Sequence, residues 1–107
     1  WDDARRAVVL RVRRRPVIDP ARPLAGLTIA VDPGHPPAGA TGPTGLYEGD
    51  AVLPVGLQLV ELLTARGATA FSTRSTLDPL GLTERAVAAR RANAHAFVSV
   101  HLNALPD

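Results

Sequence analysis

Two histidines and one glutamate stand at the ends of apolar segments, where a fold could gather them. His35 follows the apolar run LTIAVD, Glu48 comes just before a helical pattern, and His101 ends the apolar run that begins at Ala96. Imidazole nitrogen and carboxylate oxygen both suit zinc, and two imidazoles with one carboxylate leave a coordination position open for water. The sequence has no cysteine, so no thiolate competes for a metal. These residue types predict a catalytic zinc site if the fold brings them together.

The elements that would position these residues alternate along the chain. Short apolar runs predict strands at 27–32, 68–73 and 96–101, and apolar residues at helical spacing predict helices near 50–66 and 83–93. Such alternation is typical of an α/β fold, with a mostly parallel sheet covered by helices. Parallel strands end at one edge of their sheet, and the first helix starts at that edge. We therefore expect the three candidate ligands to converge there.

Three details define the expected helices. Gly67 follows Arg66 and is expected to terminate the first helix. Pro54 is compatible with that helix only in its first turn, because proline lacks a backbone N–H. Thr83 is the expected N-cap of the second helix.

Other polar residues near these segments have weaker claims to a role. Asp32 is expected to orient a ligand from outside the coordination sphere. His95 precedes the last strand, at the opposite edge of the sheet, and is expected to be a solvated turn residue. Ser99 lacks the surroundings of a nucleophile elbow. The glycine-rich segment 39–45 lacks the Lys-Ser/Thr ending of a phosphate-binding loop.

Length and composition limit the class of protein. A chain of 107 residues forms at most one domain with a modest core, and its net charge of +2 is too small to indicate a nucleic-acid partner. No apolar run is long enough to span a membrane.

Residues 1–15 hold six of the twelve arginines, around an expected strand at 7–13 with a solvated face. The proline-rich segment 16–26 is read as a linker, so residues 1–25 are expected to be the tail of a preceding β-rich module plus this linker. Because the chain opens on tryptophan rather than methionine, we expect it to be processed or excised from a longer protein.

Three motifs carry a resemblance to a known family. They are Asp-Pro-Gly-His after a strand, Gly-Leu-Tyr-Glu before a helix, and Ser-Val-His-Leu-Asn-Ala at the end of a strand. In this order and at these separations they resemble the zinc-dependent N-acetylmuramoyl-L-alanine amidases of amidase family 3. The likeness covers about residues 26–104, so residues 26–107 are expected to be the N-terminal half of such a catalytic domain.

The resemblance implies a function and a set of site residues. It implies that His35, Glu48 and His101 are the zinc ligands. Asp32 and Asn103 are expected behind these ligands or in the cleft. The implied fold is a three-layer α/β fold, with a sheet between helices. The resemblance also implies cleavage of the amide between N-acetylmuramic acid and the first L-alanine of the peptidoglycan stem peptide. A peptidoglycan substrate implies a periplasmic or extracellular location in the bacterial cell envelope.

The chain also departs from the family pattern. Pro36 and Pro37 replace the usual Gly-Gly after the first histidine, and Val52 stands where an asparagine is common. The family's catalytic glutamate is expected downstream of Asp107, so none of the residues here is assigned as the general base. Two alternatives remain open: a non-catalytic peptidoglycan-binding or regulatory module of the same fold, and another zinc hydrolase of this architecture, such as a carboxypeptidase-like enzyme.

Overall fold

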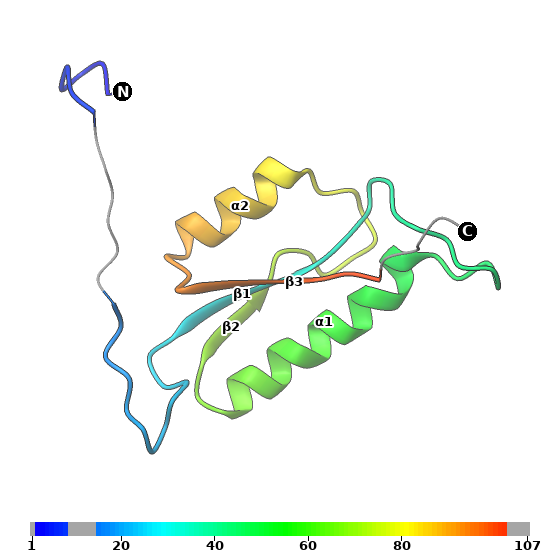
Figure 1. The fold of residues 1–107 in the computed structure, drawn as a ribbon, viewed down its shortest axis with the longest axis horizontal. Helices are drawn as coiled ribbons and strands as arrows, with labels where there is room; N and C mark the ends of the chain where they lie inside the picture. The colour runs from blue at the N-terminus through cyan, green and yellow to red at the C-terminus, as the bar shows by residue number, and fades with distance from the viewer. Residues whose placement is uncertain (1, 9–14, 103–107) are drawn as a thin grey trace.

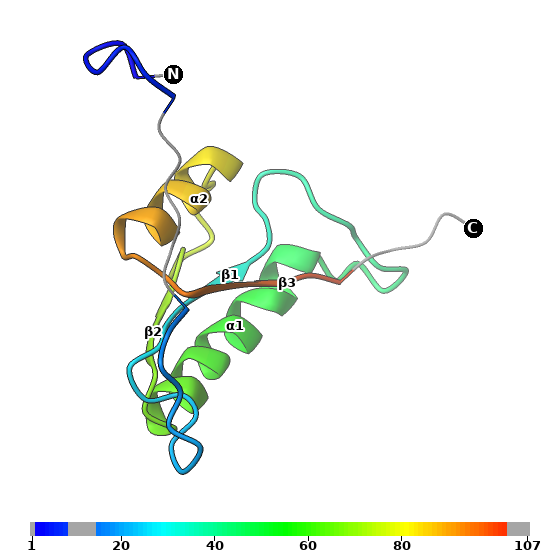
Figure 2. The same ribbon diagram turned by 60° about the vertical axis from the view of Figure 1, so that its left-hand side comes forward.

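A computed structural model describes residues 2–8 and 15–102. Strands and helices alternate within them: β1 (Thr28–Pro33), α1 (Glu48–Ala65), β2 (Thr69–Ser72), α2 (Leu82–Arg91) and β3 (Ala96–Val100). The strand order is β2-β1-β3, and β1 pairs in parallel with both neighbours. The two helices lie on opposite faces of this sheet (Figure 1), and the turned view shows the same three layers (Figure 2). The predicted α/β class is confirmed.

The residues of β1 divide between the two helices because side chains alternate across a strand. Ile29 and Val31 form the apolar cluster on the side of α1. Asp32 faces the opposite side, where its carboxylate forms a buried ion pair with Arg85 of α2. The central strand therefore makes apolar contacts on the face covered by α1 and a buried ion pair on the face covered by α2.

The core is small, as the chain length predicts. Its buried cluster consists of Ile29, Val31 and Ala68, with partly buried Leu24, Leu27, Leu59, Val60, Leu63 and Val100 packed against it. The packed part of the chain thus begins at Leu24, just before the boundary expected at residue 25. β3 lies at the edge of the sheet, and Phe97 and Val98 on it stay 45% and 38% exposed.

Both helices start earlier than the apolar pattern predicts. The expected N-cap at Thr83 is wrong: Gly81 is the N-cap of α2 and makes no side-chain capping bond. The backbone N–H of Arg85 bonds the Gly81 carbonyl at 3.2 Å, and its Nε bonds the Leu80 carbonyl at 2.8 Å. The first bond is the ordinary i→i−4 bond that opens an α-helix, whereas the side-chain bond holds the chain just ahead of the helix and helical spacing gives no sign of it.

The expectation for Pro54 is also wrong, because this proline lies in the second turn of α1 rather than the first. The helix begins at Glu48, where contacts with the preceding loop fix its start. Since proline has no N–H, the carbonyl of Asp50 lacks its intrahelical donor. Asp50 and Pro54 are both exposed, so water can bond this carbonyl.

Two expectations fall at the margins of the described chain. Most of the strand expected at 7–13 lies outside the described residues, and Asp2 and Ala7 form only an isolated antiparallel bridge. Among the helices of residues 2–8 and 15–102, none combines the length and apolar character needed to cross a membrane.

Candidate metal centre

Three side chains from three different elements meet at one edge of the sheet. His35 lies just past β1, Glu48 is the first residue of α1, and His101 follows β3. One ligand atom of each lies within 4.8 Å of the others. The parallel pairing of β1 with β3 causes the two histidines to meet, because both strands end at this edge.

Glu48 is the buried centre of the group. Its Oε2 accepts a hydrogen bond from the backbone N–H of Ala40 at 3.0 Å, and its Oε1 accepts one from that of Leu102 at 2.8 Å. Burial acts to raise the pKa of Glu48, but these two N–H donors, the His101 ring and the nearby His35 outweigh it and lower the pKa below its ordinary value. The carboxylate is therefore ionised at neutral pH, as a metal ligand must be.

The His35 ring lies between two acceptors. Its Nδ1 is 3.1 Å from the carbonyl oxygen of Pro37, and its Nε2 is 3.2 Å from Oε2 of Glu48. A carbonyl can only accept, so Nδ1 carries a hydrogen and donates it. The Nε2 of a neutral ring then points a lone pair at a carboxylate. A proton or a cation must lie between these two atoms, and this is the arrangement that a metal site needs.

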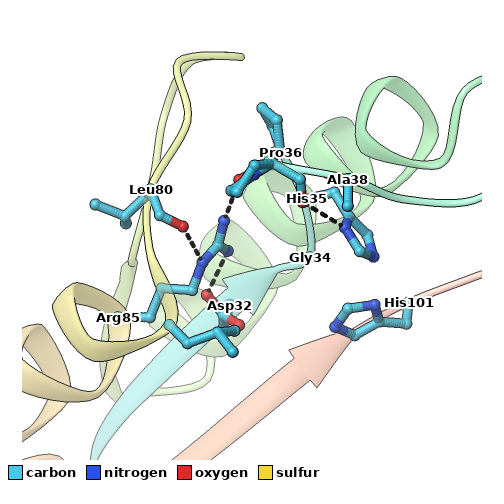
Figure 3. A pocket seen from close by; sticks show the side chains of 10 residues that line it. Asp32, Gly34, His35, Pro36, Ala38, Leu80, Arg85 and His101 are labelled. Atoms are coloured by element: carbon cyan, nitrogen blue, oxygen red, sulfur yellow. Dashed lines mark hydrogen bonds and ion pairs between the residues drawn. The ribbon is translucent and has the colours of Figure 1, made fainter.

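His101 completes the group from the other side. Its Nδ1 lies 3.0 Å from Oε1 of Glu48, and its ring meets the His35 ring edge to face, with centroids 5.0 Å apart. A Cβ at Gly34 would collide with the His101 ring, so only glycine allows this approach. Figure 3 shows the two imidazoles facing each other across the end of the sheet.

Two hollows flank the three side chains. One, of about 290 Å³, is bordered by His35 and His101 and has mainly apolar walls from Pro36, Leu80 and Leu82. The other, of about 330 Å³, reaches Glu48 from the loop that contains Pro43 and Leu46. The first hollow borders both candidate histidines and the second borders Glu48, and a concave apolar hollow beside a few polar groups is typical of a ligand site.

The remaining sequence-predicted residues have other surroundings. The hydrogen bonds of Asp32 go to Arg85, Thr73 and Ser99, and within the described chain none of those found joins it to a candidate ligand. Asp32 nevertheless borders the first hollow together with His35 and His101. Asn103 lies outside the described residues.

His95 lies at the opposite end of the sheet. It is exposed, and its Nδ1 accepts a hydrogen bond from the backbone N–H of Thr28 at 2.9 Å. Since Thr28 begins β1 and His35 follows its end, His95 is separated from the candidate ligands by the length of the strand.

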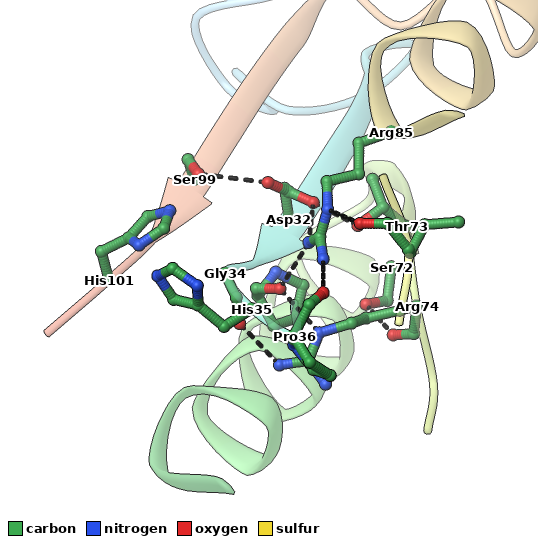
Figure 4. A network of polar contacts seen from close by, with 12 residues as sticks. Asp32, Gly34, His35, Pro36, Ser72, Thr73, Arg74, Arg85, Ser99 and His101 are labelled. Carbon is green, nitrogen blue, oxygen red and sulfur yellow. Dashed lines mark hydrogen bonds and ion pairs between the residues drawn. The ribbon is translucent and has the colours of Figure 1, made fainter. Parts of the chain in front are cut away.

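Sequence reasoning missed two buried arginines behind the site. Arg74 and Arg85 are 6% and 4% exposed, and together they bond the carbonyls of Pro33, Gly34 and Pro36 around His35 (Figure 4). Burial, and then the neighbouring Arg85, lower the pKa of Arg74. The available signal was position: Arg74 follows β2 at the same edge as the candidate ligands.

Comparison with known proteins gives a consistent result. Residues 29–107 match the family described as N-acetylmuramoyl-L-alanine amidase. The chain is 37% identical over 90 residues to the Bacillus subtilis protein YqiI, covering 82% of this chain and 43% of that protein. It is 34% identical over 101 residues to the germination-specific N-acetylmuramoyl-L-alanine amidase of the same species, covering 79% of this chain and 42% of the amidase.

The fold has a counterpart among solved structures. The amidase AmiC2 of Nostoc punctiforme superimposes with a TM-score of 0.73 at 38% identity, over 78% of this chain and 48% of that one. The chain therefore spans less than half the length of each of these relatives.

Proposed function

Because this chain belongs to the N-acetylmuramoyl-L-alanine amidase family, we propose that it supplies the metal site of a zinc-dependent peptidoglycan amidase. The bond cleaved is the amide between N-acetylmuramic acid and L-alanine. The observation that carries this proposal is the convergence of His35, Glu48 and His101 within 4.8 Å. Two imidazoles and a carboxylate, with hollows on both sides, fit a catalytic zinc site that keeps a position open for water.

Two of the three proposed ligands, His35 and Glu48, are held by specific contacts with the backbone. The Pro37 carbonyl accepts the Nδ1–H of His35 and leaves Nε2 to bind the metal. Backbone N–H groups of Ala40 and Leu102 hold both oxygens of Glu48. Zinc, when bound, would lower the pKa of a water and polarise the scissile carbonyl.

The general base is proposed to be a glutamate downstream of Asp107. Asp32, one alternative, is paired with Arg85 at 2.9 Å and accepts hydrogen bonds from Thr73 and Ser99, so both of its oxygens are already engaged. Glu84, the other, is exposed on α2. Glu48 is engaged by two backbone donors and both imidazoles.

The surroundings of the reaction follow from its substrate. We infer that the protein acts on peptidoglycan in the cell envelope, in the periplasm or outside the cell. Residues 26–107 would form the N-terminal half of the catalytic domain, and residues 1–25 would precede it as the tail of another module and a linker. Support for this comes from the family match, which begins at residue 29.

A matched pair of histidine substitutions in the full-length protein tests the proposal. His101→Ala should abolish the release of peptides that begin with L-alanine from purified peptidoglycan, because it removes a zinc ligand. His95→Ala should leave the release unchanged, because His95 lies at the other end of the sheet. Mass spectrometry of the soluble products identifies the new amino terminus.

Three other results would contradict the proposal. Equal release by both variants would exclude His101 as a ligand. Release of single carboxy-terminal residues would identify a carboxypeptidase-like enzyme. Binding to peptidoglycan with no release by the wild-type protein would favour the non-catalytic binding module.

A further inference from the structure

The side chain of Arg74 lies behind the candidate ligands. Arg74 comes two residues after β2, and its side chain is buried against the end of β1 (Figure 4). It donates four hydrogen bonds, all to backbone carbonyls: those of Pro33 at 2.8 Å, Gly34 at 2.7 Å, Gly49 at 3.0 Å and Thr76 at 2.8 Å. None of these bonds involves a carboxylate, so this buried guanidinium is held by oriented backbone groups.

The carbonyls that Arg74 bonds belong to segments that carry candidate ligands. Pro33 and Gly34 immediately precede His35, and Gly49 immediately follows Glu48. The Nε of one rigid planar guanidinium bonds the Pro33 carbonyl, and its Nη2 bonds both the Gly34 and the Gly49 carbonyls, so these two nitrogens fix the spacing between the end of β1 and the start of α1. A guanidinium has five N–H donors in a fixed fork, and few other side chains could bond these carbonyls at once.

The third ligand segment is attached to the same point. The N–H of Gly34 bonds the carbonyl of Val100 at 2.9 Å, and Val100 is the residue before His101. Gly34 thus joins β3 through its N–H and Arg74 through its carbonyl. All three ligand-bearing segments are linked within one or two hydrogen bonds of Arg74.

The second buried arginine, Arg85, bonds a different set of groups. Its guanidinium bonds Asp32 and the carbonyls of Pro33, Pro36 and Leu80. These contacts hold the His35 loop against α2, and none of them joins the segment of Glu48. Arg74 is the residue of this pair that connects two ligand segments.

We propose that Arg74 is a positioning residue for the metal site, which sets the distance between His35 and Glu48 and thereby the affinity for zinc. The inference rests on the proposed function only in taking these residues as ligands. It follows from rigidity: a three-ligand site keeps its affinity only when its ligands are held in place by the groups behind them. Positioning of this kind accounts for a buried cation, which apolar residues could replace if stability alone were at stake.

Arg74→Lys in the full-length protein tests the inference, with Arg66→Lys as control. Lysine keeps the charge but offers its donors from a single nitrogen, so it cannot bond the separate carbonyls. The Zn²⁺ affinity, measured by competition with a chelator, should fall about 10- to 100-fold in Arg74→Lys. It should change less than about twofold in Arg66→Lys, whose side chain is exposed at the end of α1.

The absorption spectrum of the Co²⁺-saturated protein separates positioning from simple stabilisation. A positioning role predicts altered d–d bands in Arg74→Lys at saturating metal, whereas a stabilising role would lower only the melting temperature. Unchanged affinity and spectrum would overturn the inference. So would failure of both Arg74→Lys and Arg74→Gln to fold at saturating zinc, because Arg74 would then be a folding residue. A wild-type protein that binds no zinc would instead contradict the proposed function, and the inference with it.

Discussion

The two helices are attached to the same sheet by different forces. α1 packs Leu59, Val60 and Leu63 against the apolar cluster of Ile29 and Val31. The only buried residue of α2 is Arg85, and its bonds go to Asp32 and to backbone carbonyls. Apolar contact is non-directional, whereas a guanidinium bonds only where acceptors meet its fork.

The difference teaches how this edge of the sheet is built. α1 provides a candidate ligand, Glu48, and its packing is tolerant of small displacements. α2 provides no candidate ligand, and its one buried side chain fixes the loop on both sides of His35 through the carbonyls of Pro33 and Pro36. Apolar burial thus holds α1 to the sheet, whereas directed polar bonds hold α2 and fix the geometry of the His35 loop.

The largest effect should come from breaking the polar attachment. Arg85→Ala leaves the buried carboxylate of Asp32 without its cation and should lower the free energy of unfolding by about 3–5 kcal/mol. Arg90→Ala, on the same helix but exposed, should cost about 0.5 kcal/mol or less. Denaturant unfolding of the full-length protein measures both. A cost below about 1 kcal/mol for Arg85→Ala would mean that α2 is held by other contacts.

A smaller effect should come from trimming the apolar attachment. Leu59→Ala removes a partly buried side chain of the core cluster and should cost about 2 kcal/mol, at the low end for leucine. Leu62→Ala on the same helix is the control, and its 47% exposure predicts a cost of about 0.5 kcal/mol. If the two variants unfold at the same denaturant concentration, the packing described for α1 is wrong.

The smallest effect is a loss of stability at acidic pH, caused by protonation of Glu48 at the start of α1. The pKa of Glu48 lies below its ordinary value of 4.5, so the folded protein holds this proton less tightly than the unfolded chain. Its contribution to stability is present above the unfolded pKa and is lost as the pH falls through the folded pKa. In metal-free protein, melting temperatures below pH 4.5 should therefore fall more steeply for the wild type than for Glu48→Gln. Parallel curves for the two proteins would show that Glu48 has no such linkage.

The sequence predicted the strands well, because short apolar runs between prolines and glycines leave few alternatives. These runs predicted where β1 and β3 end, and because the two strands are parallel neighbours, they also predicted that His35 and His101 lie close together. The helix starts were predicted less well. Glu48 begins α1 through contacts with Ala40 and Leu102, which are distant in sequence, and the segment before α2 is held by the side chain of Arg85; local spacing reveals none of these contacts.

The buried arginines could not be predicted from the pattern. Arginine is mostly a surface residue, and Arg74 and Arg85 occur in segments that otherwise look solvated. Their burial depends on a convergence of carbonyls from β1, α1 and the loops, which exists only in the folded chain. The candidate ligands were predictable from topology, but the groups that hold them were not.

X-ray diffraction at the zinc absorption edge, from crystals of the full-length protein grown with zinc, tests the central claim most directly. We expect one strong anomalous peak among His35, Glu48 and His101, with ligand distances of about 2.0–2.2 Å. A zinc ion bound by other residues, with these three side chains free of metal in a protein that still releases stem peptides, would contradict the account.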